Sequence, residues 1–251
     1  MGNVAIVTGA SSGIGYAVSK QLLAKGYRVY GLSRRGTGPD DTIGVAVDIT
    51  DEAAVREVVD RIVRIEGTVD ILVNNAGMGI SGPVEFSETE DVRRIMDVDF
   101  MGQFFAVKAV LPYMRKQRSG TVVFTTSVAA PIAIPYQAFY SAAKAAVNAM
   151  AFALRNEVRP FGIKITCVMP GDARTGFTDA RKKQSSGDEI YRNNASAVAA
   201  MEKDERSGMT SEYVAKRIVK AALKREPAAA YTVGPKYKAF LFLFKLVPAG
   251  L

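Results

Sequence analysis

Histidine is absent from this chain of 251 residues, and cysteine occurs once, as Cys167. Without histidine, no Ser-His-Asp hydrolase, no Cys-His nucleophile pair and few kinds of zinc catalysis are available. A single cysteine also excludes an intrachain disulfide and a cysteine-based zinc site, which suits a reducing, cytoplasmic compartment. Proton transfer must therefore come from tyrosine, lysine, serine or a carboxylate, and we expect no metal site.

Long hydrophobic runs are also missing. No stretch reaches the roughly 18 apolar residues of a membrane-spanning helix, and the chain does not begin with a secretory leader pattern. The most apolar segment, residues 239–244, is flanked by Lys236, Lys238 and Lys245. This segment fits either a helix buried against the domain or a subunit, or a surface for peripheral membrane contact or a lipophilic substrate.

The net charge is +8, from 33 basic and 25 acidic residues. The basic residues form no dense stripe with interleaved aromatic side chains, which nucleic-acid binding would favour. We therefore expect a basic surface and no nucleic-acid partner.

Strand-like and helical segments alternate along the chain. Short β-rich runs are read at the following positions: 4–7, 28–32, 44–47, 69–73, 121–126, 164–169 and 231–233. Such alternation predicts an α/β fold, a Rossmann-type doubly wound parallel sheet of about seven strands with helices on both faces. We expect residues 1–251 to form one domain, within which the polar stretch 172–208 is long enough to be a substrate lid.

A glycine-rich loop follows the first predicted strand and opens a helix. Gly9 allows a tight turn, Gly13 removes a side chain where backbone must approach phosphate, and Gly15 lets the helix pack closely on the sheet. The N-terminus of that helix would direct free N–H groups at a pyrophosphate. Its Gly-x-x-x-Gly-x-Gly spacing differs from the commonest dinucleotide-binding pattern.

The second informative set is Ser127, Tyr140 and Lys144. The Tyr-x-x-x-Lys pattern also occurs at Tyr16 and Lys20, but only the later copy has a serine thirteen residues earlier at a strand end. One helical turn places the Lys144 ammonium near the Tyr140 phenol, and a nearby cation lowers a tyrosine pKa from about 10. Tyr140 could then act as general acid or base without histidine.

These motifs resemble the short-chain dehydrogenase/reductase family in its compact form of about 250 residues. The matching positions are residues 8–15, Asp48, residues 74–77, the Ser127, Tyr140 and Lys144 set, and Pro170-Gly171 with Thr175. The resemblance implies that Asn74 steadies the sheet, that Ser127 binds the substrate oxygen, and that Tyr140 transfers the proton. It also implies a homodimer or homotetramer, and a carbonyl or alcohol as the small-molecule substrate.

Cofactor contacts are implied by the same resemblance, with Asp48 at the adenine, Lys144 at the nicotinamide ribose and Thr175 at the carboxamide. The full set of expected cofactor-binding residues is Gly9, Ser11, Ser12, Gly13, Ile14, Gly15, Ser33, Arg34, Asp48, Ile49, Asn75, Ala76, Gly77, Tyr140, Lys144, Pro170, Gly171 and Thr175.

The second strand ends in Ser33, Arg34 and Arg35, where relatives that prefer NAD usually carry an acidic residue. A carboxylate would repel a 2′-phosphate, whereas arginine can form charge-assisted hydrogen bonds to it. We therefore expect NADP(H) to be favoured over NAD(H), mainly through Arg34 and Ser33. The alternative is a pair of solvated loop arginines.

One catalytic position departs from the family pattern, because Asp99 stands where the family usually has asparagine. An ionised Asp99 at about 6 Å from Lys144 would weaken its field by at most about 2–3 kcal/mol. A carboxyl that points into water or is protonated would have no such effect.

Two classes of function fit these residues. The favoured one is an NADP(H)-dependent oxidoreductase that interconverts a ketone or aldehyde and an alcohol, on a substrate expected to be apolar. The alternative is a non-catalytic NADP(H)-sensing or scaffold protein on the same fold.

The two copies of Tyr-x-x-x-Lys allow a matched test. We expect Tyr140→Phe to remove the proton donor and lower turnover by a factor on the order of 10²–10⁴ while cofactor binding is retained. Tyr16→Phe, the control, should leave turnover unchanged in the same steady-state assay. Equal losses in both variants would show that the wrong copy has been chosen.

Overall fold

The computed structural model describes residues 3–244 and residue 246. A seven-stranded sheet at its centre has the order β3-β2-β1-β4-β6-β7-β11, and every neighbouring pair is parallel. Its strands are β1 (Val4–Thr8), β2 (Arg28–Ser33), β3 (Ile43–Ala46), β4 (Ile71–Asn74), β6 (Gly120–Thr125), β7 (Ile163–Pro170) and β11 (Ala230–Val233). This arrangement confirms the predicted doubly wound sheet.

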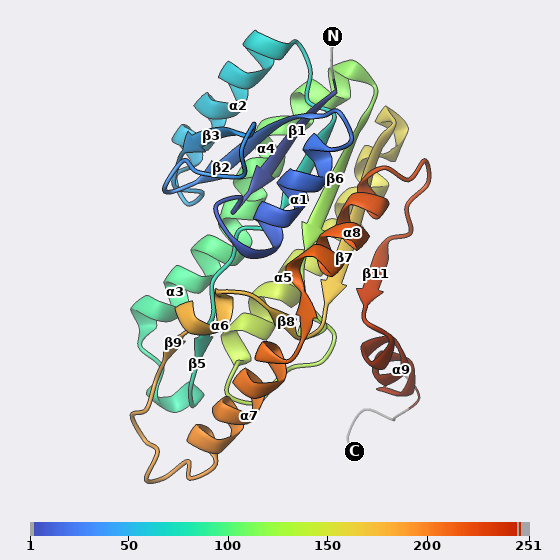
Figure 1. The fold of residues 1–251 in the computed structure, drawn as a ribbon. Helices are drawn as coiled ribbons and strands as arrows, with labels where there is room; N and C mark the ends of the chain where they lie inside the picture. The colour runs from blue at the N-terminus through green and yellow to red at the C-terminus, as the bar shows by residue number, and fades with distance from the viewer. Residues whose placement is uncertain (1–2, 245, 247–251) are drawn as a thin grey trace.

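Helices cover both faces of the sheet (Figure 1). Their bounds are α1 (Gly13–Leu23), α2 (Glu52–Glu66), α3 (Thr89–Met96), α4 (Gly102–Gln117), α5 (Ala138–Val158), α6 (Phe177–Ala180), α7 (Asn194–Arg206), α8 (Ser211–Ala222) and α9 (Pro235–Phe244). Short 3₁₀ turns occupy Val84–Phe86 and Arg159–Phe161, and a π-helix, Asp97–Met101, joins α3 to α4.

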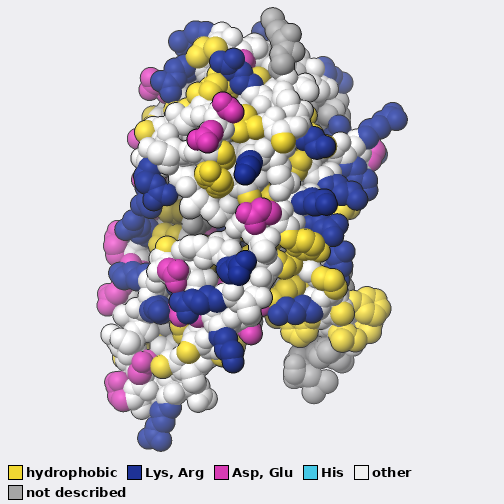
Figure 2. Space-filling model, in the orientation of Figure 1, with side chains coloured by type: hydrophobic (Ala, Val, Ile, Leu, Met, Phe, Trp, Pro, Cys, Tyr) yellow, Lys and Arg dark blue, Asp and Glu magenta, His cyan; other side chains and the backbone are white. Residues whose placement is uncertain are grey.

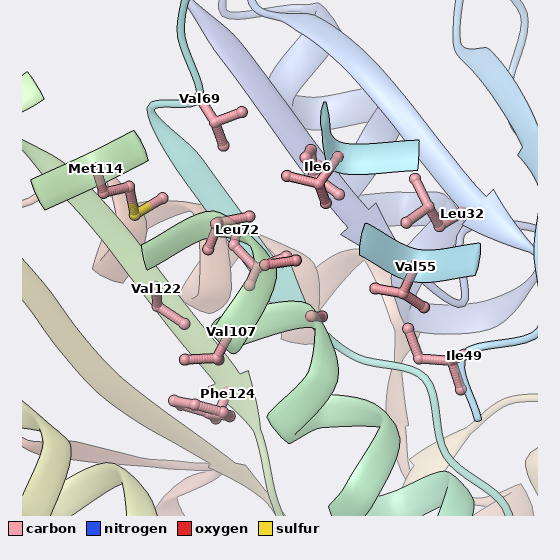
Figure 3. Packing of buried hydrophobic residues seen from close by; sticks show 14 of the residues in the cluster. Ile6, Leu32, Ile49, Val55, Val69, Leu72, Val107, Met114, Val122 and Phe124 are labelled. Atoms are coloured by element: carbon pink, nitrogen blue, oxygen red, sulfur yellow. The ribbon is translucent and has the colours of Figure 1, made fainter. Parts of the chain in front are cut away.

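Alternation along each strand divides the core in two. On β1, Val4 and Ile6 pack with α2, α4 and α5, while Ala5 and Val7 pack on the other face with α1 and α8. Figure 3 shows part of the first cluster, where Val122 and Phe124 of the sheet lie near Val107 of α4. Because successive side chains point to opposite faces of a strand, both faces need apolar residues, and the strands read as continuous apolar runs.

Local signals set the ends of several helices. The Asp51 carboxylate accepts a hydrogen bond from the Ala54 N–H at 2.9 Å and so caps the start of α2. Gly67, with φ of 77°, ends the same helix in the left-handed conformation that glycine adopts at little cost.

The order of the strands places a switch point between β1 and β4. From β1 the chain moves outward through β2 to β3, then returns to add β4, β6, β7 and β11 on the other side of β1. Ligands of open α/β sheets bind beyond the carboxyl ends of the strands at such a point.

Residues 172–208 lie beyond those carboxyl ends, in the lower part of Figure 1. The stretch is more regular than its polar sequence indicates, since it contains β8 (Ala173–Arg174), α6, β9 (Lys182–Lys183) and α7. β8 pairs with β10 (Met209–Thr210), and β9 pairs with β5 (Ile80–Ser81). A buried Arg181 forms an ion pair with Glu205, which also accepts a hydrogen bond from Thr178 at 2.7 Å.

Across the described residues, no helix combines the length and the apolar character needed to cross a bilayer.

Candidate active site

The residues singled out from the sequence converge at the carboxyl edge of the sheet. Gly9 follows β1, Arg34 follows β2, Asn75 follows β4, and Gly171 follows β7. Ser127 comes two residues after β6, which brings it to the same edge. Parallel strands run in one direction, so their ends meet on one side even though the residues are far apart in the chain.

The backbone of the glycine loop favours glycine at two positions and leaves no room for a side chain at a third. Gly9 and Gly13 have positive φ angles of 69° and 56°, which favour glycine. A Cβ on Gly15 would lie 2.3 Å from the Gly9 carbonyl oxygen and 2.6 Å from Nδ2 of Asn75. The first helical turn therefore packs directly on the β1 and β4 loops, as the sequence predicts.

The N-terminus of α1 is free to bind an anion. Ser12 at the N-cap makes no side-chain capping hydrogen bond, and the first turn has no acidic residue. The N–H groups of this turn lack the side-chain partner that most helices supply. Beside it, Nη2 of Arg35 donates a hydrogen bond to Oγ of Ser11 at 3.0 Å, which brings a guanidinium to the loop.

The loop after β4 is fixed to the end of β1. Oγ1 of Thr8 accepts hydrogen bonds from the Asn75 N–H at 2.9 Å and the Ala76 N–H at 3.0 Å. Nδ2 of Asn74, which is fully buried, donates to the carbonyl oxygen of Gln103 on α4 at 2.9 Å. The Thr8 bonds tie the loop after β4 to the end of β1, and the Asn74 bond ties the end of β4 to α4.

Asp48 and Ile49 follow β3 and lie at the outer end of this edge. Asp48 accepts hydrogen bonds from the N–H and the hydroxyl of Thr50, and the backbone bond is the main reason that its pKa is lowered. Arg34 adds an attraction in the same direction. Ile49 packs against Gly102 at the start of α4, where a Cβ would lie only 2.8 Å from Cγ2 of Ile49.

Tyr140 and Lys144 lie one turn apart on α5, as predicted. Nζ of Lys144 is 5.4 Å from the centre of the Tyr140 ring, and the Ser127 side chain is near enough to the Tyr140 hydroxyl to lower its pKa. The Phe177 ring of α6 lies 5.6 Å from the Tyr140 ring, centre to centre. Serine, tyrosine and lysine are therefore in contact beneath an aromatic residue of the 172–208 stretch.

Asp99 forms a salt bridge with Lys144, with Oδ2 and Nζ 2.8 Å apart and side chains only 0% and 5% exposed. Its other oxygen, Oδ1, accepts a hydrogen bond from the Met78 N–H at 2.7 Å. Asp99 does not point into water, and the separation of about 6 Å assumed from the sequence is wrong. The π-helix gives the physical reason, because its wider turn directs Asp99 inward onto α5.

Burial and charge oppose one another at Tyr140. Burial raises the pKa of its hydroxyl above the usual 10, Lys144 lowers it, and Asp99 raises it. The net direction is upward, so the lowering expected from Lys144 alone is outweighed. Burial also raises the pKa of Asp99 against the pull of Lys144. For Lys144, burial acts to lower the pKa, but Asp99 and Tyr140 together raise it.

Thr175 closes over the glycine loop from the 172–208 side. A Cβ on Gly13 would meet Cβ of Thr175 at 3.4 Å, and Oγ1 of Thr175 accepts a hydrogen bond from the Phe177 N–H at 3.1 Å. Pro170 ends β7, and Gly171 is covered by the Tyr237 ring of α9, which a Cβ there would approach to 2.2 Å.

The family model for short chain dehydrogenases matches residues 3–186. The chain belongs to this family. It is therefore an NAD(P)-dependent oxidoreductase of the dehydrogenase/reductase class.

Two curated relatives and one solved structure place the chain within the family. The 3-ketodihydrosphingosine reductase of Bacteroides thetaiotaomicron is 40% identical over 239 residues, which cover 92% of this chain and 88% of that protein. The NADPH-dependent 3-dehydrocapnine reductase of Ornithobacterium rhinotracheale is 30% identical over 97% of this chain and 92% of its own length. A short chain dehydrogenase/reductase from Burkholderia phymatum, solved in complex with NAD, has a TM-score of 0.84 and 25% identity, covering 100% and 98% of the two chains.

The residues present fit a nicotinamide dinucleotide. An uncapped helix N-terminus and an adjacent guanidinium suit a pyrophosphate, and the glycines leave the backbone accessible. Gly77 leaves open the space over the ion pair, because a Cβ there would lie 3.0 Å from Oδ2 of Asp99 and 3.2 Å from Nζ of Lys144.

Some neighbours of the site had no sequence signal. Gln103, Glu205 and Tyr237 come from α4, α7 and α9, and no short motif relates them to the glycine loop or to Tyr140. In the sequence, Arg35 is one of two adjacent arginines, and its contact with Ser11 requires β1 and β2 to be paired. The direct bond between Asp99 and Lys144 depends on the π-helix, which the sequence pattern does not indicate.

The ion pair leads to a pH prediction for this dehydrogenase. Asp99→Asn removes a charge that raises the pKa of Tyr140, so the phenolate forms at lower pH and the oxidation-direction profile should move to lower pH. We expect the variant to remain active, because asparagine keeps an oxygen that can accept the Met78 N–H. Profiles of initial rate against pH measure the shift.

Thermal unfolding of the Asp99→Asn protein is recorded beside its parent, so that a loss of fold is recognised as such. Superimposable pH profiles would dismiss the electrostatic role of Asp99. A folded but inactive variant would show that the carboxylate itself is required.

Proposed function

We propose that the protein is an NADP(H)-dependent oxidoreductase that interconverts a ketone or aldehyde and an alcohol on an apolar substrate, with Tyr140 as the general acid and base. The observation that carries this proposal is the convergence of Ser127, Tyr140 and Lys144 beside the glycine loop. Because the chain contains no histidine, a tyrosine beside a lysine supports the role of proton donor.

The roles follow from the contacts. In the reductive direction, the Tyr140 hydroxyl gives its proton to the carbonyl oxygen, which the Ser127 hydroxyl holds by a hydrogen bond. The phenolate left on Tyr140 is stabilised by the Lys144 ammonium. The bound nicotinamide supplies or accepts the hydride. In the oxidative direction the Tyr140 phenolate takes the proton back from the alcohol.

Asp99 acts on Tyr140 indirectly, by positioning the Lys144 ammonium. Its two oxygens are bonded to the Lys144 ammonium and to the Met78 N–H, so it fixes the lysine relative to the loop after β4. A buried ammonium with a partner on one side stays charged and keeps a defined position under Tyr140. The carboxylate also moderates the field that Tyr140 experiences, which sets the pH at which the hydroxyl ionises.

The dinucleotide would be held by the residues expected from the sequence. The α1 N-terminus with Ser11, Ser12 and Ile14 would receive the pyrophosphate, and Asp48 with Ile49 would border the adenine. The central part of the dinucleotide would be lined by Asn75, Ala76 and Gly77. Thr175 would reach the nicotinamide from the side of the 172–208 stretch. The short approach of Thr175 to Gly13 supports this last role.

An apolar substrate is supported by two observations. Phe177 lies against Tyr140, so an aromatic surface borders the position of the reacting oxygen. The relative at 40% identity is a reductase of 3-ketodihydrosphingosine, which is a ketone on a long alkyl chain. We propose a ketone with an extended apolar chain as the substrate class.

The 172–208 stretch is proposed to be the lid of this single-domain enzyme. It carries Phe177 to Tyr140 and Thr175 to Gly13, so both halves of the site are completed by it. We also propose assembly as a homodimer or homotetramer. Phe152 of α5 is 41% exposed, and a partner subunit would cover it.

The choice of cofactor gives a prediction on β2. We expect NADPH to be used in preference to NADH, and Arg34→Ala to weaken NADPH by roughly tenfold or more while NADH is little changed. The physical reason is loss of a charge-assisted hydrogen bond to the 2′-phosphate. Apparent KM values for both cofactors are measured for the parent, Arg34→Ala and Arg35→Ala.

Arg35→Ala separates the two arginines, because Arg35 already contacts Ser11. Arg94→Ala is the matched control, since its guanidinium also lies near Asp48 but comes from α3. A preference for NADH in the unmodified protein would overturn the expectation.

The reaction itself is tested by product identification. The protein is incubated with NADPH and a panel of ketones that share a carbonyl and differ in alkyl chain length, and the alcohols are identified by mass spectrometry. We expect kcat/KM to rise with chain length, by up to about threefold to fourfold per buried methylene at roughly 0.8 kcal/mol. No alcohol with any ketone, while NADPH still binds, would favour a cofactor-sensing or scaffold role.

A further inference from the structure

Helix α9 exposes most of its apolar residues. The side chains of Phe240, Phe242 and Leu243 are 54%, 65% and 58% exposed, and Phe244 is also largely exposed. Leu241 is the one buried residue of the helix. Figure 2 shows the result as a patch of hydrophobic side chains that protrudes over α9. A contiguous apolar patch of this kind marks an interaction surface in most proteins.

Basic side chains surround the patch. Lys236 and Lys238 are exposed on α9 itself, and Lys216, Arg217 and Lys220 are exposed on α8. β11 contacts both helices, so α8 and α9 lie beside the same edge strand. In Figure 2, Lys and Arg side chains run along the α8 and β11 edge directly above the hydrophobic patch. Lys245, grouped with these lysines from the sequence, lies outside the described residues.

We propose that this α8–α9 face, defined by the four apolar and five basic residues just named, binds the surface of an anionic phospholipid bilayer. The phenylalanine and leucine side chains would enter the boundary between headgroups and acyl chains, while the lysines and arginine meet the anionic headgroups. Ten helical residues extend about 15 Å, half the hydrocarbon thickness, so α9 lies in the surface.

Charge decides between a bilayer and a second copy of the chain. Two copies related by a twofold axis would bring the same face together, and basic side chains would then oppose basic side chains. The protein carries a net charge of +8, which adds to that repulsion. An anionic bilayer complements both the apolar and the basic parts of the face.

The face is joined to the active site by direct contacts. The Tyr237 ring of α9 covers Gly171, its hydroxyl donates a hydrogen bond to Asp172, and Nζ of Lys236 lies 3.5 Å from Asp172. Asp172 opens the 172–208 stretch. A bound α9 would thus hold the entrance of the site at the bilayer surface. This consequence, unlike the binding itself, rests on the proposed function for an apolar substrate.

Vesicle co-sedimentation tests the binding. The full chain is mixed with vesicles of neutral phosphatidylcholine, with or without about one third phosphatidylglycerol. We expect binding to the anionic vesicles that weakens in high salt, and at least tenfold weaker binding for Phe240→Ser/Phe242→Ser/Phe244→Ser. Lys216→Glu/Lys220→Glu should lose binding to a similar degree.

Matched controls remove the same kinds of side chain elsewhere. Ile65→Ser/Val84→Ser removes two exposed apolar residues, and Arg56→Glu/Arg61→Glu reverses two exposed charges on α2. Both should bind like the parent. Reduction of a short, water-soluble ketone is assayed for every variant, so that failure of the reductase proposal is seen separately from failure of binding.

Three outcomes would overturn the inference. The parent protein could fail to bind anionic vesicles, or the α9 variant could bind as well as the parent. In sedimentation velocity, the α9 variant could instead convert a dimer into a monomer, which would assign this face to a second copy of the chain.

Discussion

The buried ion pair between Asp99 and Lys144 joins three parts of the chain that are far apart in the sequence. It links the π-helix before α4 to α5, and through the Met78 N–H it reaches the loop after β4. Two charges that are removed from water must be paired, because either one alone would be strongly destabilising. The position of the Lys144 ammonium is therefore fixed before any ligand arrives, and the environment of Tyr140 is fixed with it.

The parallel direction of the strands places that ion pair beside the glycine loop. All seven strands are parallel, so their carboxyl ends and the loops that follow them share one edge. The glycine loop can approach the β4 loop closely only because Gly9 and Gly15 have no side chains. At this edge, one end suits a pyrophosphate and the other holds Tyr140, the proposed proton donor. Phe177 and Thr175 complete it from the 172–208 side.

The carboxyl edge of the sheet also contacts the exposed helix α9. Tyr237 connects α9 to Gly171 and Asp172, the residues where β7 ends and the 172–208 stretch begins. The exposed phenylalanines of α9 and the lysines of α8 are thus attached to the site by a short path of contacts. One aromatic ring of α9, that of Tyr237, therefore contacts the residues at the end of β7.

The sequence by itself determined the strand–helix alternation, the parallel sheet, the glycine loop, and the pairing of Tyr140 with Lys144. These features depend on local periodicity, on glycine at fixed spacing, and on the geometry of one helical turn. Only the tertiary structure decided that Asp99 bonds Lys144 at 2.8 Å, that Arg35 contacts Ser11, and that Tyr237 covers Gly171. It also decided that burial outweighs Lys144 in setting the pKa of Tyr140. Desolvation and long-range contacts depend on which surfaces pack together, and no spacing within a single segment encodes them.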